Sequence, residues 1–252
     1  MPAHRFTFFN NSGISAAAID LPGHGADDTP PGLITLNDYA RSITDALTEP
    51  TLLAGPSAGG FAITAAAERD PSHVAGLICL SACIPAPGLS LGDLRRAGPR
   101  QPLQGALHLS DDRLSYKVDP TAARRLVCQD CPEETAAGAV SPLGPAPVLP
   151  QSVPLSLSHI SQDLPRHAIL TTDDRTIPPD LQARMAAGLP KACITTRPCG
   201  QSPFFAASDD LVRRLIGLAQ GGMGSGGQRP CCWSLADRCV SSGRAPKPGP
   251  GV

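Results

Sequence analysis

Apolar residues along this chain form two alternating patterns, continuous runs and helically spaced runs. Continuous runs of this kind are typical of buried strands, and they lie at residues 14–20, 51–54, 74–83, 167–172 and 192–197. Between them, apolar residues three and four positions apart predict helices at residues 35–47, 58–69, 179–188 and 208–219. Strands that alternate with helices predict an α/β fold with a doubly wound, mainly parallel sheet.

Two stretches break this alternation. Residues 85–165 contain many prolines, mixed charge and only short helical pieces such as residues 120–127, which predicts a cap inserted into the core. The α/β core is then formed by residues 14–84 and 166–220. Residues 221–252 are rich in Gly, Pro and Cys without periodicity, which predicts a disordered tail.

The N-terminal stretch predicts an unusual start of the fold. Residues 4–9 resemble a strand, and residues 10–13 resemble a turn that leads back into the run at 14–20. A parallel crossover needs about a dozen connecting residues, usually with a helix. The turn is too short for that, so the first strand is expected either to pair antiparallel or to stay outside the sheet. We therefore expect the first βα unit, over residues 1–13, to be missing or altered.

Composition narrows the possible partners. Of the 252 residues, 41% are hydrophobic, which supports one packed domain, and the formal net charge is −1. A chain so close to neutrality indicates neither a nucleic-acid nor an anionic-membrane partner, and a small neutral substrate is expected. The sequence has no apolar run of about 18 residues. Residues 1–10 lack the apolar stretch of a secretory signal, and we expect a cytoplasmic protein.

The nine cysteines do not indicate a disulfide scaffold, because their number is odd and they are scattered over a long chain. Residues 128–132 read C-Q-D-C-P, but a redox motif of this kind follows a strand, whereas a predicted helix at 121–127 precedes it here. Cys231, Cys232 and Cys239 have no second Cys or His cluster at zinc spacing. No metal or other cofactor is expected.

Residues 55–59, with the sequence G-P-S-A-G, have the pattern of a nucleophile elbow. In such an elbow a serine lies on a sharp turn between a strand and a helix, where glycines make room for the close backbone. An apolar strand is predicted before Ser57 and a helix after it, as the pattern requires. The backbone N–H of Ala58 would then face a developing oxyanion. The alternative is an ordinary turn in which Ser57 only caps the helix.

A serine nucleophile of this type is followed in the chain by an acid and then by a histidine base. Asp173 and Asp174 follow the predicted strand at 167–172. Asp174 is the candidate acid, because the turn that leads to residues 177–178 comes directly after it. The alternative is a solvated turn aspartate beside Arg175.

Four motifs in sequence order, at residues 20–25, 55–59, 172–178 and 200–204, resemble those of an α/β-hydrolase of the methylesterase and hydroxynitrile-lyase-like branch. The resemblance extends over residues 14–219. It implies an α/β-hydrolase fold and the hydrolysis of small carboxylic esters without a cofactor. It also implies a catalytic serine, acid and histidine, and the residues at these three positions are Ser57, Asp174 and Gln201.

The chain departs from the family pattern at the position of the base. Gln201 stands where members of the family carry a histidine, and a neutral amide cannot take up a proton at physiological pH. Pro56 also replaces a histidine of the family elbow, and the loop that supplies half of the oxyanion hole is not recognisable before residue 14. Loss of one oxyanion donor costs roughly 10²- to 10³-fold in turnover, and loss of a triad member costs more. We expect esterase activity to be absent or strongly impaired.

Three alternatives stay open from the sequence. Another histidine could replace the base, and His24 is the best placed of them, although a structural turn histidine is the simpler interpretation. The protein could be a non-catalytic binder of a small ester or apolar ligand in a crevice between sheet and cap. It could also be a truncated or frame-altered hydrolase product. The candidate histidines are His4, His24, His73, His108, His159 and His167.

Overall fold

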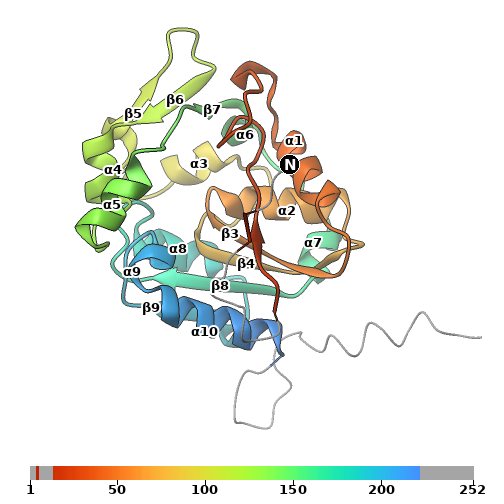
Figure 1. The fold of residues 1–252 in the computed structure, drawn as a ribbon. Helices are drawn as coiled ribbons and strands as arrows, with labels where there is room; N and C mark the ends of the chain where they lie inside the picture. Colours follow the sequence, from red (N-terminus) through yellow and green to blue (C-terminus); the bar gives the residue numbers. More distant parts are fainter. Residues whose placement is uncertain (1–3, 6–13, 222–252) are drawn as a thin grey trace, which may run out of the picture.

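The computed structural model describes residues 4–5 and 14–221 of the chain (Figure 1). Its central sheet has four parallel strands in the order β3-β4-β8-β9. The strands are β3 (Thr51–Ser57), β4 (Val74–Ala82), β8 (Arg166–Thr171) and β9 (Ile194–Arg197). The predicted α/β fold and its parallel sheet are thereby confirmed.

Helices cover both faces of the sheet (Figure 1). One face carries α1 (Leu36–Asp45), α2 (Gly59–Arg69) and α8 (Pro179–Ala186), and the other carries α10 (Ser208–Ala219). Within β4, Leu77 and Cys79 belong to the core beneath α2, whereas Ile78 and Leu80 pack with the core beneath α10. Successive side chains of a strand point to opposite faces, so a strand covered on both sides needs a continuous apolar run.

The N-terminal strand lies outside the central sheet. β1 (His4–Arg5) pairs antiparallel with β2 (Ala17–Ala18) in a separate two-stranded sheet, which confirms the expected antiparallel pairing. Residues 6–13 of the predicted strand and turn lie outside the described residues. The prediction of a buried parallel strand at 14–20 is wrong, because this stretch is largely half-exposed and, among the described residues, pairs with β1 alone. Its alanines carry little apolar surface, so burial in the central sheet would stabilise it little.

Residues 85–165 lie between β4 and β8 and contain a second sheet (Figure 1). This sheet is antiparallel and consists of β5 (Leu107–Leu109), β6 (Ser115–Val118) and β7 (Ala146–Pro147). The helices of the segment are α3 (Leu91–Arg96), α4 (Pro120–Leu126), α5 (Glu133–Val140), α6 (Leu149–Ser152) and α7 (His159–Asp163). The predicted helix at 120–127 is α4, but the short strands were not predicted. The role of the segment as a cap stays a prediction.

The remaining short elements connect these layers. Helical turns lie at Pro31–Leu33, Gln104–Ala106 and Lys191–Cys193, and α9 (Pro203–Ala206) precedes α10. Among the helices of the described ranges, none is long and apolar enough to cross a membrane. The tail predicted at 221–252 lies outside the described residues, except for Gly221.

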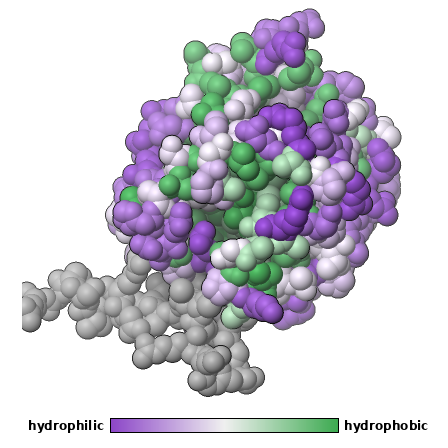
Figure 2. Space-filling view, turned by 180° about the vertical axis from the view of Figure 1, so that it is seen from behind, coloured by the Kyte–Doolittle hydropathy of each residue, from purple (hydrophilic) through white to green (hydrophobic). Residues whose placement is uncertain are grey.

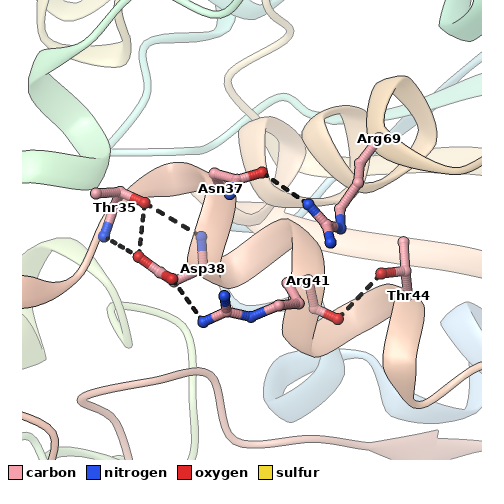
Figure 3. A network of polar contacts seen from close by, with 6 residues as sticks. All are labelled: Thr35, Asn37, Asp38, Arg41, Thr44 and Arg69. Atoms are coloured by element: carbon pink, nitrogen blue, oxygen red, sulfur yellow. Dashed lines mark hydrogen bonds and ion pairs between the residues drawn. The ribbon is translucent and has the colours of Figure 1, made fainter.

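Helix α1 begins at a capping box (Figure 3). The Thr35 hydroxyl accepts from the backbone N–H of Asp38 at 3.3 Å, and the Asp38 carboxylate accepts from the Thr35 N–H at 2.9 Å. The other Asp38 oxygen binds Arg41 at 2.7 Å. Arg69, at the end of α2, donates to the Asn37 side chain at 3.2 Å. The box satisfies the first free N–H groups of α1, and the Arg69 contact ties this helix to α2, which follows the elbow.

Glu68 at the end of α2 holds the start of α7. Its carboxylate accepts from the backbone N–H and hydroxyl of Ser158, at 3.0 and 2.5 Å. It also accepts from the N–H and hydroxyl of Ser161. Burial alone would raise the pKa of Glu68, but these hydrogen bonds outweigh burial and hold the pKa below its ordinary value. A carboxylate at a helix N-terminus stabilises the unpaired N–H groups there.

Glu68→Gln is therefore expected to lower the free energy of unfolding by about 1–2 kcal/mol at neutral pH, because part of the carboxylate stays in contact with solvent. Because the folded-state pKa of Glu68 is depressed, its contribution is complete above the ordinary value of 4.5 and is lost as the pH falls through the folded value. Urea denaturation should thus show a wild-type advantage at neutral pH that shrinks in acid. Glu49→Gln, at an exposed position, is the control. Equal stability of Glu68→Gln and wild type at neutral pH would refute this role.

Candidate active site

Ser57 lies at the sharp turn between β3 and α2, as the elbow pattern predicts. Its φ of +53° is in the left-handed region, which is unusual for a residue with a side chain. The turn depends on glycines on either side. A Cβ on Gly55 would lie 2.4 Å from the carbonyl oxygen of Gly59, and a Cβ on Gly60 would lie 2.3 Å from that of Cys83. The backbone is therefore packed too closely here for any other residue.

The backbone of Ser57 is tied to the end of β4. Its carbonyl oxygen accepts from the N–H of Cys83 at 3.0 Å, which joins the elbow to the residue after β4. Ser57 itself is half-buried. Ala58 precedes the first residue of α2, so its N–H has no acceptor within that helix. The N–H of Ala58 thus has the position expected of an oxyanion donor.

Asp174 lies in the loop after β8 and is 5% exposed. One carboxylate oxygen accepts from the N–H groups of Thr176 at 2.7 Å and Ile177 at 2.9 Å. The other accepts from the Gln182 side chain at 2.7 Å and the Thr171 hydroxyl at 3.3 Å. Burial raises the pKa of Asp174 to about 6, although these hydrogen bonds favour the charged form. The alternative of a solvated turn aspartate is wrong, because the carboxylate is enclosed.

Gln201 is 3% exposed and lies in the loop before α9. Its Nε2 donates to the carbonyl oxygen of Ser81 at 2.8 Å. A carbonyl can only accept, so this contact fixes which end of the amide faces Ser81. The other end, Oε1, is buried and has no hydrogen-bond partner among the described residues. The residue at the position predicted for the base therefore has a hydrogen-bond acceptor, Oε1 of Gln201, that no described residue occupies.

The three candidate residues follow the carboxyl ends of strands in the central sheet: Ser57 ends β3, Asp174 follows β8 and Gln201 follows β9. Ser81, near the end of β4, binds Gln201 through its carbonyl and accepts from the Thr171 hydroxyl at 3.1 Å. Thr171 in turn contacts Asp174. Ser81 has a φ of +45°, which is a second left-handed backbone beside the first. Carboxyl ends of parallel strands are where open α/β sheets bind ligands.

Gln129 and Asp130, which the sequence did not mark as site residues, also connect the loops at this edge of the sheet. The Gln129 side chain donates to the carbonyl of Asp173, and the Asp130 carboxylate accepts from the N–H of Gly200 at 2.6 Å. Both lie between the cysteines of the C-Q-D-C-P stretch, after the end of α4. They connect the loop of Asp174 with the loop of Gln201. No periodicity or motif points to this contact, because it joins positions far apart in the sequence.

The described histidines that form side-chain hydrogen bonds contact residues other than Ser57. Nε2 of His24 lies 2.6 Å from the Tyr39 hydroxyl, and burial lowers the pKa of His24. His167 contacts Thr195 at 2.8 Å and Arg214 at 2.8 Å, and burial, with the nearby Arg214 charge, lowers its pKa to about 4. The structural interpretation of His24 is thus supported. Among the described side chains, no histidine hydrogen-bonds to Ser57, and the side chain of His4 lies outside them.

Two cavities occur away from the elbow. One of about 430 Å³ is bordered by His108, Asp119 and Arg125, and one of about 210 Å³ is bordered mainly by apolar residues such as Leu114 and Val148, together with Arg113 and Ser152. On the face opposite to that of Figure 1, apolar residues gather in a shallow hollow with a polar rim (Figure 2). No group of three or more His, Cys, Asp or Glu side chains suited to a metal occurs in the described part of the chain.

Comparison with known proteins agrees with the fold and with the elbow pattern of the sequence. A family model described as the alpha/beta hydrolase family matches residues 2–214. The chain belongs to this family. A pyrethroid hydrolase of Sphingobium wenxiniae is 26% identical over 221 residues, which cover 82% of this chain and 78% of that protein. Methylesterase 17 of Arabidopsis thaliana is 26% identical over 231 residues, covering 82% of each chain. The resemblance to methylesterase-like α/β hydrolases is confirmed.

Solved structures share the fold. The crystal structure of a pyrethroid hydrolase matches with a TM-score of 0.74 and 22% identity, over 84% of this chain and 89% of that one. That of a methylesterase from Arabidopsis matches with a TM-score of 0.72 and 20% identity, over 85% and 90% of the two chains. At these identities the structures establish the α/β-hydrolase fold of the chain.

The buried carboxyl of Asp174 makes a testable contribution to stability. Its pKa rises from an ordinary 3.8 to about 6 on folding, so the folded state binds the proton more tightly than the unfolded state. Stability should therefore fall as the pH rises from about 4 to about 6, by on the order of 3 kcal/mol. Asp174→Asn should remove this pH dependence, and Asp173→Asn, at the exposed neighbour, should keep it. The free energy of unfolding, measured by urea denaturation across this pH range, tests the prediction. If it falls with pH as steeply in Asp174→Asn as in the wild type, the pH dependence does not come from Asp174.

Proposed function

We propose that this protein is an esterase-like α/β hydrolase in which Ser57 has the place of the nucleophile, Asp174 that of the acid and Gln201 that of the base. Its ligand is a small carboxylic ester, and it uses no cofactor. Turnover through an acyl-enzyme is absent or strongly impaired. The observation that carries this proposal is the amide of Gln201, which is buried and held by the Ser81 carbonyl.

The chemical argument concerns the proton of the Ser57 hydroxyl. A serine hydroxyl attacks a carbonyl well only when a base takes its proton. The Gln201 amide can accept a hydrogen bond at Oε1, but it cannot be protonated at neutral pH. The described histidines that form side-chain hydrogen bonds do so with other residues. His24 contacts Tyr39, and His167 contacts Thr195 and Arg214. Among the described side chains, no histidine is hydrogen-bonded to Ser57 as a base would be.

In our proposal, stabilisation of an oxyanion is also weak. The elbow supplies one donor, the N–H of Ala58, and the loop that supplies the second donor in the family is not recognisable in the sequence before residue 14. A missing oxyanion donor reduces turnover by roughly 10²- to 10³-fold. The missing base and the missing oxyanion donor both slow the attack of Ser57 on the ester carbonyl. A low rate of hydrolysis is therefore expected even for an activated ester.

A second candidate function is a binder that does not turn its ligand over. The buried Oε1 of Gln201, without a partner among the described residues, favours this candidate, because a ligand with an N–H or O–H group would satisfy it. Binding does not need a base. A ligand that raises the melting temperature without being hydrolysed would distinguish the binder from the enzyme.

A fluorophosphonate probe tests whether Ser57 is activated. Such probes phosphonylate serines whose hydroxyl has a working base. We expect no labelling of Ser57, measured by intact mass, over a period in which an active esterase is labelled completely. Ser57→Ala serves as the control for labelling elsewhere. Rapid and stoichiometric labelling of Ser57 would mean that another group acts as base, and the proposal would fail.

Gln201→His tests the missing base directly. An imidazole at this position should raise the hydrolysis of p-nitrophenyl acetate by about 10²-fold, the lower range for general base catalysis. The gain should vanish in the double variant Ser57→Ala/Gln201→His, and Gln201→Asn should show none. If folded Gln201→His gains nothing, the replaced base is not the limiting defect and the oxyanion donors become the better explanation.

A further inference from the structure

We infer that Cys128 and Cys131 form a redox-sensitive dithiol, which closes to a disulfide and thereby fixes the turn that carries Gln129 and Asp130. Both cysteines are free thiols in this structure. The inference goes beyond the proposed function, because it concerns how the edge of the site is held and not turnover at Ser57. Three observations carry it: the turn between the two cysteines, the contact of their side chains and the contacts of the two residues between them.

The two cysteines are the first and last residues of a tight turn. The N–H of Cys131 donates to the carbonyl of Cys128 at 3.1 Å. The Cα atoms at the ends of such a turn are less than about 7 Å apart, and a disulfide needs Cα atoms that are about 4.4–6.8 Å apart. The turn joins α4 to α5, which lie side by side (Figure 1). A disulfide therefore fits this turn without a rearrangement of the helices.

The side chains of the two cysteines also meet. Cys128 is buried in a small apolar cluster with Ala123, Ala136 and Val140, and Cys131 packs against the same cluster. The two thiols hydrogen-bond to each other. Cys131 is half-buried, so it is the thiol that a small reagent reaches first. Cys128, behind it, is placed to attack whatever Cys131 has bound.

The residues between the cysteines hold the loops of the candidate site. Gln129 donates to the carbonyl of Asp173, and Asp130 accepts from the N–H of Gly200 at 2.6 Å. The turn also packs closely on Gly200, because a Cβ there would lie 2.8 Å from Oδ1 of Asp130 and 3.1 Å from Cδ of Gln129. A bond that fixes the turn therefore also fixes the loop after β8 and the loop that carries Gln201.

The oxidant for this step is a low-molecular-weight disulfide such as oxidised glutathione. The thiolate of Cys131 attacks one of its sulfurs, forms a mixed disulfide and releases one glutathione. The thiolate of Cys128 then attacks the sulfur of Cys131 and releases the second glutathione. The two thiol protons go to the two released glutathiones, and two electrons pass from the dithiol to the glutathione disulfide.

Burial affects both the rate and the persistence of the disulfide. It raises the pKa of Cys131 to about 12, and it raises the pKa of Cys128 although the charge of Arg124 opposes this. Few thiolates are present at neutral pH, so the disulfide forms slowly. A disulfide is easily reduced when neighbouring charges stabilise the thiolate of its reduced form. Burial has the opposite effect here, so the disulfide persists once it has formed.

Peptide mapping tests whether the disulfide forms. Trypsin releases residues 126–166 as one peptide, and Cys128 and Cys131 are its only cysteines. The full chain is incubated with oxidised glutathione at about pH 8.5, near the ordinary pKa of a thiol, and remaining thiols are alkylated before digestion. We expect most of this peptide to escape alkylation and to lose the mass of two hydrogen atoms. Cys128→Ser should instead keep glutathione bound to Cys131, and Cys199→Ser should behave as the wild type.

Two further measurements test whether the disulfide fixes the turn. Oxidation should raise the melting temperature by about 5 °C, as expected for a bond that closes a short loop. It should also slow deuterium exchange at the N–H of Gly200 by about 10-fold. Neither change should follow the same treatment of Cys128→Ser. Asp130→Ala should keep the rise in melting temperature but lose the slower exchange, because the N–H of Gly200 then lacks its acceptor.

Three outcomes would overturn the inference. The first is a wild-type peptide that stays reduced at equilibrium with oxidised glutathione, and the second is a glutathione adduct that does not resolve to a disulfide. The third is a disulfide that changes neither the melting temperature nor the exchange at Gly200. If Cys128→Ser does not fold, Cys131→Ser, at the more exposed position, replaces it and should form no disulfide. None of these measurements depends on activity at Ser57, so a failure of the proposed function would leave them unchanged.

Discussion

The close backbone packing at the elbow is the constraint on which the rest of the structure depends. Gly55 and Gly60 leave no room for a Cβ, because atoms of Gly59 and Cys83 lie within 2.4 Å of where it would stand. This packing puts the end of β3, the start of α2 and the end of β4 in one place. Ser57 accepts a left-handed backbone there, a strain that is typical of functional sites and is held by the surrounding sheet. The site is built around this turn.

Asp174 and Gln201, the acid and the residue at the position of the base in our proposal, are each held by their own contacts. The Asp174 carboxylate accepts from the Gln182 side chain and from the N–H groups of Thr176 and Ile177. Burial nevertheless dominates and raises the pKa of Asp174 to about 6. Gln201 is bound instead to the carbonyl of Ser81. The hydrogen bonds that hold Asp174 thus come from its own loop, from β8 and from α8.

Residues 85–165 contribute to the position of the candidate site. Gln129 and Asp130 join the loop of Asp174 to the loop of Gln201. In α/β folds the sheet supplies a rigid scaffold, and functional residues are often carried by the connecting segments. The contacts of Gln129 and Asp130 therefore tie this segment to the loops that carry the candidate residues.

The sequence by itself determined the alternating strands and helices, the elbow at Ser57 and the candidates Asp174 and Gln201, because these depend on local periodicity and short motifs. It misplaced the stretch at 14–20, where an apolar run of small residues resembled a buried strand although it pairs with β1 outside the central sheet. The burial of Asp174, the contact of Gln201 with Ser81, and the contacts of Gln129 and Asp130 with the loops of Asp174 and Gln201 were decided only by tertiary structure. Each of these joins residues distant in the chain or depends on which side of an element faces the core, and neither spacing nor composition records such contacts.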